Sequence, residues 1–244
     1  MGMEIKMPVQ EEKMQIFLQN KTERAIPENE ADTLLFRVAV DLAENMPREA
    51  AIAGLREEKD GEVLFYLRAL LKEKAALSKA RGMSADDASF AYTAAHGNIL
   101  CLFGAKGIGK SGSLLRAAEA LGVRGLFIDT VKLLAASLRE LQEIFTRLKE
   151  LAETENVLPC FCKYRAEEPQ GKEAERRDAA GRTGLHFLLD FLSHGLYLSA
   201  WLSAEKPDEL LEYELHPVFI EYPPLTVRER ERLWEALAGD CLSE

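Results

Sequence analysis

Residues 98–111, NILCLF followed by GAKGIGKS, decide the fold of this 244-residue chain. The six residues 98–103 form a short, mostly apolar run of the kind that is buried on both faces in a parallel β-sheet. A glycine-rich segment follows at once, and a helical pattern continues through Leu121. This order of strand, glycine-rich loop and helix predicts the first unit of an α/β fold.

The loop over residues 104–111 matches the pattern G-x-x-x-x-G-K-[ST] at every fixed position. Its glycines let the backbone fold into a nest of N–H groups that point at phosphate oxygens, and the next helix presents its positive end to the same anion. We expect Lys110 to reach the outer phosphates of ATP and to act in catalysis, and the Ser111 hydroxyl to hold Mg²⁺. The alternative is a glycine-rich turn that binds no ligand. The predicted nucleotide-binding residues are Gly104, Ala105, Lys106, Gly107, Ile108, Gly109, Lys110, Ser111 and Gly112.

Strands and helices alternate after residue 97. The predicted strands cover residues 98–103, 123–129, 157–162, 196–202 and 218–222. The predicted helices cover the residues after the loop through Leu121, then residues 131–156, 183–193 and 227–238, the last with Thr226 and Glu229 as a capping box. This alternation predicts a doubly wound parallel sheet flanked by helices, forming a P-loop nucleotide-binding core over residues 98–244.

Residues 1–97 show a helical pattern instead. The first 28 residues have little periodicity and are interpreted as a loosely ordered lead-in. The predicted helices cover residues 29–46, 48–56, 62–80 and 84–96. We therefore predict a small all-helical N-terminal domain over residues 1–97.

Composition excludes several classes of function. The net charge of −10 gives the chain no overall basic character for binding a nucleic-acid backbone, so nucleic acid is not an expected main partner, although a local basic patch stays open. No apolar run approaches the roughly 20 residues that a membrane span needs, and the chain does not open on a signal-peptide pattern. Four cysteines do not make a disulfide framework in a chain of this length. These observations predict a cytoplasmic protein with no membrane partner.

With these motifs in place, the sequence resembles the AAA+ branch of P-loop ATPases over about residues 98–238. The resemblance rests on the phosphate loop, on five strands in the order that such cores use, and on residues 216–234, HPVFIEYPPLTVRERERLW, which look like the entry to an AAA+ lid. The helical segment before residue 98 is similar to the N-terminal segments of a group of bacterial AAA+ ATPases. The resemblance implies an ATP-binding protein, homo-oligomeric or with a protein partner, that converts nucleotide state into conformational change.

The end of the third strand departs from the AAA+ pattern. AAA+ proteins place Asp-Glu there to hold magnesium and to orient the attacking water, whereas this chain has Cys-Phe-Cys-Lys at residues 160–163. Glu167 and Glu168 in the following loop are the candidate catalytic acids, and Asp129 ends the neighbouring strand. The sequence therefore supports nucleotide binding better than nucleotide turnover.

Two further positions differ from the family. The fourth strand of an AAA+ core carries a polar sensor residue, for which Ser199 is the best candidate, with Ser203 behind it. The sequence ends at Glu244, one helix into the lid segment, so we expect a lid that is absent or that continues beyond this sequence.

Two other functions stay open. A small-molecule or nucleotide kinase would use Asp129 to orient an acceptor hydroxyl, although a helix-start cap is the simpler role for that residue. A regulatory or scaffold subunit would keep the fold without hydrolysis, as the altered third strand suggests. We interpret Cys160 and Cys162 as core residues on opposite faces of their strand rather than as a metal pair. The polar residues 163–182 are expected to form a solvated loop or a contact with a partner.

Overall fold

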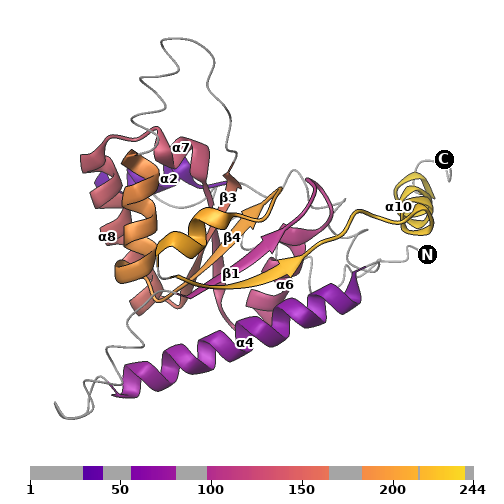
Figure 1. Cartoon of the computed structure of the whole chain (residues 1–244), viewed down its shortest axis with the longest axis horizontal. Coiled ribbons are helices and arrows are strands. Elements are labelled where there is room, and N and C mark those ends of the chain that lie inside the picture. The colour runs from indigo at the N-terminus through magenta and orange to yellow at the C-terminus, as the bar shows by residue number, and fades with distance from the viewer. Residues whose placement is uncertain (1–29, 41–55, 81–97, 165–182, 214, 240–244) are drawn as a thin grey trace, which may run out of the picture.

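The computed structural model describes residues 30–40, 56–80, 98–164, 183–213 and 215–239. Five strands form one parallel sheet in the order β2-β3-β4-β1-β5 (Figure 1). The strands are β1 (Asn98–Phe103), β2 (Arg124–Asp129), β3 (Val157–Tyr164), β4 (Leu198–Ser203) and β5 (His216–Glu221). The predicted α/β fold with a parallel sheet is confirmed.

Strands β1 and β4 lie inside the sheet, and their residues are buried almost without exception. Helices cover both of their faces, so no polar alternation is needed along them. One face carries Ile99, Cys101 and Trp201, and the other carries Leu100 and Leu102. The continuous apolar run of residues 98–103 therefore identified an interior strand correctly.

Helices pack on both faces of the sheet (Figure 1). The face with Trp201 is covered by α2 (Glu30–Val38), α7 (Thr130–Leu134), α8 (Leu138–Thr154) and a helix over residues 183–190 that ends in the π-helical turn η3 (Phe191–Gly195). The opposite face is covered by α4 (Glu57–Ala80) and α6 (Lys110–Ala120). A short 3₁₀ helix, η4 (Asp208–Tyr213), leads into β5.

The two described helices that precede β1 contribute to the same cores as the sheet. Leu34, Leu35 and Val38 of α2 pack with the residues of one face, while Val63 and Leu67 of α4 pack with the other. The structure thus attaches α2 and α4 to the sheet rather than to each other. For the remainder of residues 1–97, most of which lie outside the described residues, a separate helical domain stays a prediction.

The predicted helix over residues 29–46 is too long. α2 ends at Val38, and Ala39 forms an antiparallel bridge with Ile128 on the outer edge of β2. Val40 N donates to Phe127 O at 2.9 Å. The sequence pattern at Ala39 is helical, but the backbone there pairs with the edge of the sheet instead of continuing the helix.

The predicted helix over residues 131–156 is two helices. α7 ends at Leu134, and Ser137 begins α8 with a capping box: its hydroxyl accepts from Glu140 N at 3.3 Å, while the Glu140 carboxylate accepts from Ser137 N at 2.9 Å. Serine followed three residues later by glutamate is the sequence signature of a helix start. The apolar stripe across residues 133–151 keeps one helical spacing, so the sequence pattern did not separate the two helices.

The predicted helix over residues 62–80 starts earlier, at Glu57. Its first turn holds Glu57, Glu58 and Asp60, which are stabilised by the positive end of the helix. Gly61 does not end the helix, and nothing lies within 4 Å of a Cβ placed there. The predicted helices over residues 48–56 and 84–96 lie outside the described residues, apart from Arg56.

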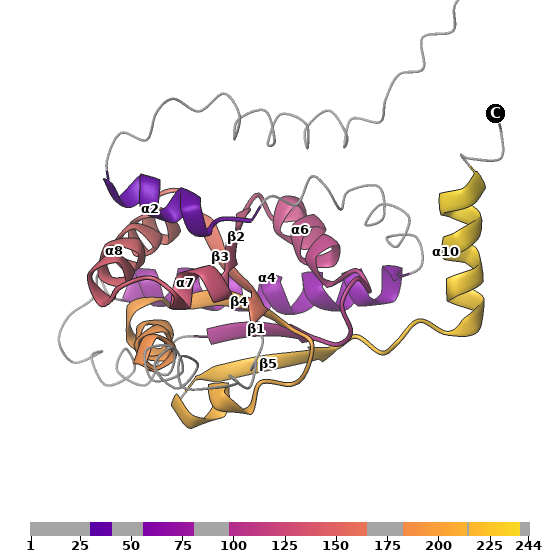
Figure 2. The ribbon, with the colours of Figure 1, turned by 90° about the horizontal axis from the view of Figure 1, so that it is seen from above.

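The last helix, α10 (Val227–Gly239), stands apart from the sheet and its covering helices (Figures 1 and 2). The predicted capping box is confirmed, because Glu229 Oε2 accepts from Thr226 N and from Thr226 Oγ1, both at 2.7 Å. Trp234 on this helix is 71% exposed. Of the helices that the structure describes, none combines the length and the apolar character that a membrane crossing needs.

Candidate functional site

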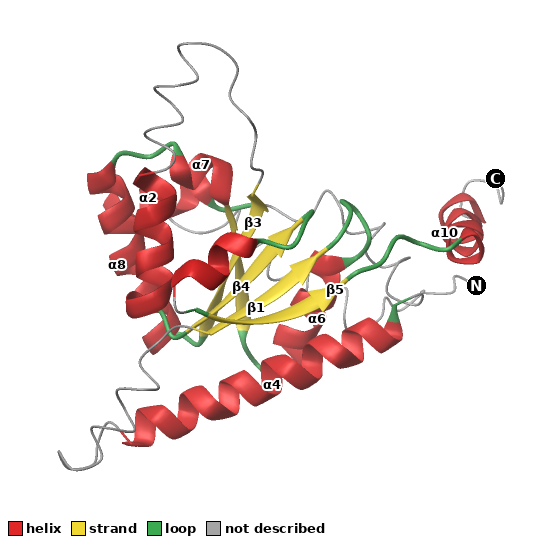
Figure 3. Cartoon of the chain, viewed as in Figure 1, coloured by secondary structure: helices red, strands yellow, loops and turns green. Residues whose placement is uncertain are grey.

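The glycine-rich loop lies between β1 and α6, at the carboxyl edge of the sheet, where the loops meet the arrowheads in Figure 3. Three of its glycines have positive φ: 137° at Gly104, 74° at Gly107 and 98° at Gly109. Glycine adopts these angles at little cost, whereas other residues are strained there. The loop sequence therefore produces a compact turn at the edge where ligands bind in open parallel sheets.

The loop leads directly into the first turn of α6. Gly109 is the N-cap residue and provides no side-chain acceptor, and the first turn of α6 holds no acidic residue. Ser111, whose side chain is half-buried, lies in this turn. Helix starts without a capping side chain leave backbone N–H groups and a partial positive charge for an external anion.

Lys110 folds back over the loop. Its ammonium donates to the carbonyl of Gly104 at 2.6 Å and to the carbonyl of Ala105 at 2.7 Å. These carbonyls belong to the first two residues of the loop, so the positive charge sits above the turn that the glycines form. Ala105 and Lys106 are exposed at its tip.

The base of the loop is fixed in the core. Ile108 is 6% exposed and packs among the residues of the α4 and α6 face. A Cβ on Gly104 would stand 2.2 Å from the carbonyl oxygen of Tyr222, which shows how closely the two backbones approach. Gly104 N donates to Ser203 O at 3.2 Å, which links the loop to the end of β4.

A polar cluster lies beneath α6, next to this anchor. Arg116 on α6 makes two hydrogen bonds to Asp60 on α4, from Nε at 2.8 Å and from Nη2 at 2.9 Å. Tyr222 is 1% exposed, and burial raises the pKa of its hydroxyl, which lies near Ser113. The Asp60–Arg116 pair joins the helix that follows the loop to α4. Sequence patterns did not indicate this pair, because Asp60 and Arg116 are far apart in the chain.

The end of β3 carries the two cysteines. Cys160 and Cys162 belong to the same core cluster, so the expectation that they lie on opposite faces is wrong: residues two apart in a strand share a face. Burial, followed by the neighbouring Cys162, raises the pKa of the Cys160 thiol well above its ordinary value. The prediction that both are core residues is confirmed.

The candidate acids do not assemble at the loop in the described part of the chain. Glu167 and Glu168 lie outside the described residues. Asp129 is 4% exposed and caps α7, accepting from Lys132 N at 3.2 Å. The helix-start role of Asp129 is confirmed, and the carboxylate has less freedom to orient a substrate hydroxyl.

The structure separates the two sensor candidates on β4. Ser199 pairs with Ile99, near the amino end of β1, whereas Ser203 pairs with Phe103, the last residue before the loop. Four residues of strand span about 13 Å, so Ser199 is remote from the loop. Ser203 is buried at the loop edge, beside both Gly104 and Tyr164 of β3. The sequence made Ser203 the second candidate, because the predicted strand ended at residue 202, one residue before the observed end of β4.

Among the described residues, the loop offers one side chain of the kind expected to bind magnesium, that of Ser111. Ser111 lies in the first turn of α6, and the described residues hold no group of three His, Cys, Asp or Glu side chains able to bind a metal. Magnesium commonly keeps several waters and binds through few protein ligands together with phosphate oxygens. The site fits an ion that arrives with a nucleotide, and does not fit a metal cage built from protein side chains.

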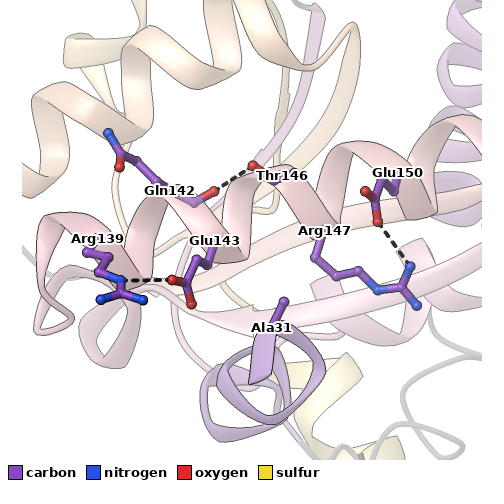
Figure 4. Close-up of a pocket in the computed structure, with 7 residues that line it drawn as sticks. All are labelled: Ala31, Arg139, Gln142, Glu143, Thr146, Arg147 and Glu150. Atoms are coloured by element: carbon purple, nitrogen blue, oxygen red, sulfur yellow. Dashed lines mark hydrogen bonds and ion pairs between the residues drawn. The ribbon is translucent and has the colours of Figure 1, made fainter. Parts of the chain in front are cut away.

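The structure also has a shallow groove far from the loop, between α2 and α8 (Figure 4). Its volume is about 480 Å³, and its charges pair within the groove: Arg139 with Glu143 at 3.1 Å and Arg147 with Glu150 at 3.2 Å. Such pairs leave little unsatisfied charge for a ligand. The groove is lined by Ala31, Arg139, Gln142, Glu143, Thr146, Arg147 and Glu150.

No protein-family model matches the chain, and no curated protein sequence matches it significantly. The assignment of the site therefore depends on the loop, the helix start and the lysine that lies over them.

Proposed function

We propose that this protein binds ATP together with Mg²⁺ through the loop over residues 104–112 and couples the bound nucleotide to a conformational change within an assembly. The observation that carries the proposal is the loop itself. Three glycines with positive φ bend the backbone, α6 begins without a capping side chain, and the Lys110 ammonium lies over the turn. A polyphosphate would accept from the main-chain amides and replace the carbonyls now bound to Lys110.

The sheet supports an AAA+-like version of this function. The loop follows an interior strand, with β5 on one side and β4 on the other, and β3 lies beyond β4. The resemblance to AAA+ cores rests on the order of these strands and helices along the chain. The sheet brings the ends of β4 and β3 together at residues 203 and 164, beside the loop. Ser203 is therefore our candidate for the polar sensor residue, in place of Ser199.

Binding has more support than hydrolysis. Phosphoryl transfer requires a group that orients the attacking water, and in the described residues the end of β3 supplies Cys162 followed by Lys163 and Tyr164. A regulatory subunit that binds nucleotide without turnover is therefore the second candidate function. A kinase is a weaker candidate, because Asp129 is occupied as a helix cap.

Titration calorimetry of the full chain with ATP and Mg²⁺ tests the proposal. Lys110→Ala is expected to weaken binding roughly 10- to 150-fold, since a hydrogen bond to a charged group contributes about 1.5–3 kcal/mol. Lys149→Ala is the matched control, because it removes the same charge from an exposed position on α8, outside the loop. Equal affinities of Lys110→Ala and the parent protein would remove the proposal.

Steady-state phosphate release separates the two candidate functions. An ATPase is expected to turn over and to lose activity in Glu167→Gln, in Glu168→Gln or in Ser203→Ala. A regulatory subunit is expected to bind ATP tightly and to release no phosphate. This result should hold both for the monomer and for any oligomer that size-exclusion analysis identifies.

A further inference from the structure

The segment between β5 and α10 touches the phosphate loop and α4 at the same time. Tyr222 N donates to Phe103 O at 2.8 Å, and the Tyr222 carbonyl packs tightly against Gly104. The next carbonyl, that of Pro223, accepts from Arg56 Nη2 at 2.9 Å. A single residue step therefore separates the contact with the loop from the contact with the residue that precedes α4.

Arg56 is a buried cation whose bonds are incomplete. The residue is 6% exposed, its Nη1 lies 3.9 Å from Glu229 Oε1, and its Nε has no hydrogen-bond partner among the described residues. A buried donor without an acceptor costs free energy, and buried charges require good pairing. A displacement of Pro223 or Glu229 would therefore change how well the Arg56 guanidinium is paired.

Glu229 connects Arg56 to the start of α10. One oxygen of this carboxylate accepts from the backbone and side chain of Thr226, and the other faces Arg56. The bonds from Thr226, and then the charge of Arg56, lower the pKa of Glu229. The same carboxylate thus caps α10 and faces Arg56, so a movement of the Arg56 guanidinium would act on the start of α10.

We propose that Arg56 is a joint through which the occupancy of the phosphate loop sets the position of α10. This inference rests on the proposed function. A bound polyphosphate draws the Lys110 ammonium away from the Gly104 carbonyl, and Gly104 is in close contact with Tyr222. The shift passes along the backbone to Pro223 and Arg56, where a closer contact with Glu229 fixes the first turn of α10.

The joint gives α10 a consequence for assembly. α10 stands apart from the sheet in both views, and it exposes Val227 and Trp234 (Figures 1 and 2). Its tie to Arg56 therefore decides where this apolar surface is presented to other molecules.

Hydrogen exchange of the full chain, with and without ATP and Mg²⁺, tests the joint. In the parent protein we expect nucleotide to slow exchange of the α10 amides by about fivefold or more, which is the lower range of coupling between sites. Arg56→Met keeps the volume of the side chain and removes its donors, so it is expected to bind ATP normally and to lose the slowing. Arg228→Met, an exposed arginine on α10, is the matched control and is expected to keep it.

The outcomes distinguish the joint from the proposed function. Calorimetric heat with ATP but unchanged exchange of α10 overturns the joint alone, as does slowing that persists in Arg56→Met. No heat in the parent protein overturns both. Glu229→Gln is the second variant, in case Arg56→Met unfolds: it keeps an acceptor for Thr226, removes the charge opposite Arg56, and is expected to lose the slowing. Slowing that persists in Glu229→Gln also overturns the joint.

Discussion

Adding one methyl group at the start of the phosphate loop, in Gly104→Ala, is expected to destabilise the whole sheet. The new Cβ would stand 2.2 Å from Tyr222 O and 2.9 Å from Ile108 Cδ1. Reaching an ordinary C···O separation of about 3.3 Å requires the two backbones to part by about 1 Å. Tyr222 cannot retreat freely, because its N–H is bonded to Phe103 O at 2.8 Å.

The magnitude has two parts. A side chain at φ 137° costs about 1–2 kcal/mol, and overpacking costs about 1–3 kcal/mol. We therefore expect Gly104→Ala to lower the free energy of unfolding by about 2–5 kcal/mol, a large share of the roughly 5–15 kcal/mol of an ordinary domain.

Gly122→Ala is the matched control for this prediction. Gly122 also has positive φ, 67°, but nothing lies within 4 Å of a Cβ placed there. The control is expected to lose only about 1–2 kcal/mol. Urea unfolding, analysed for both midpoint and slope, measures the two losses. If the two variants lose the same free energy, the close approach of Gly104 to Tyr222 is not the cause and the reasoning fails.

Three further predictions concern the rest of the molecule. Hydrogen bonds from Ser137, and then from Arg37, lower the pKa of Glu140 to about 2. The stabilising effect of this carboxylate is therefore full above pH about 4.5 and lost as the pH falls towards 2, so the stability difference between the parent protein and Glu140→Gln should shrink across that window in urea titrations. A double-mutant cycle on Asp60→Asn and Arg116→Met should give a coupling energy of about 1 kcal/mol or more in the same assay, and a coupling near zero would contradict the bidentate geometry. Burial raises the pKa of Cys101 to about 12, so mass-spectrometric mapping should find Cys101 unlabelled by iodoacetamide at pH 8 until the protein unfolds.

The sequence predicted the sheet well because its signals are local. The apolar run of residues 98–103 became β1 within its predicted bounds, and the loop that follows needed its glycines at the angles they adopt. The capping box at Thr226 also depends only on neighbours in the chain. Each of these features is decided by residues fewer than about ten positions apart.

Features that depend on distant contacts were missed or misplaced. The helical pattern around Ala39 gave no sign that this residue pairs with Ile128, and Ser199 was preferred to Ser203 because pairing register cannot be read from one strand alone. The joint at Arg56 requires three segments that meet only after folding. The error about Cys160 and Cys162 was different in kind, since the two-residue period of a strand already places them together.

The bridge at Ala39 has a consequence for how copies of this protein can associate. It occupies the outer edge of β2, so a strand from another molecule cannot extend the sheet there without displacing it. At the opposite edge, Tyr222 N points to β1, and since N–H groups alternate along a strand, Pro217 lacks its N–H on the outward side. The bridge and Pro217 thus each hinder strand addition at one margin, so self-association is expected to use side-chain contacts between helices or loops rather than a continued backbone ladder.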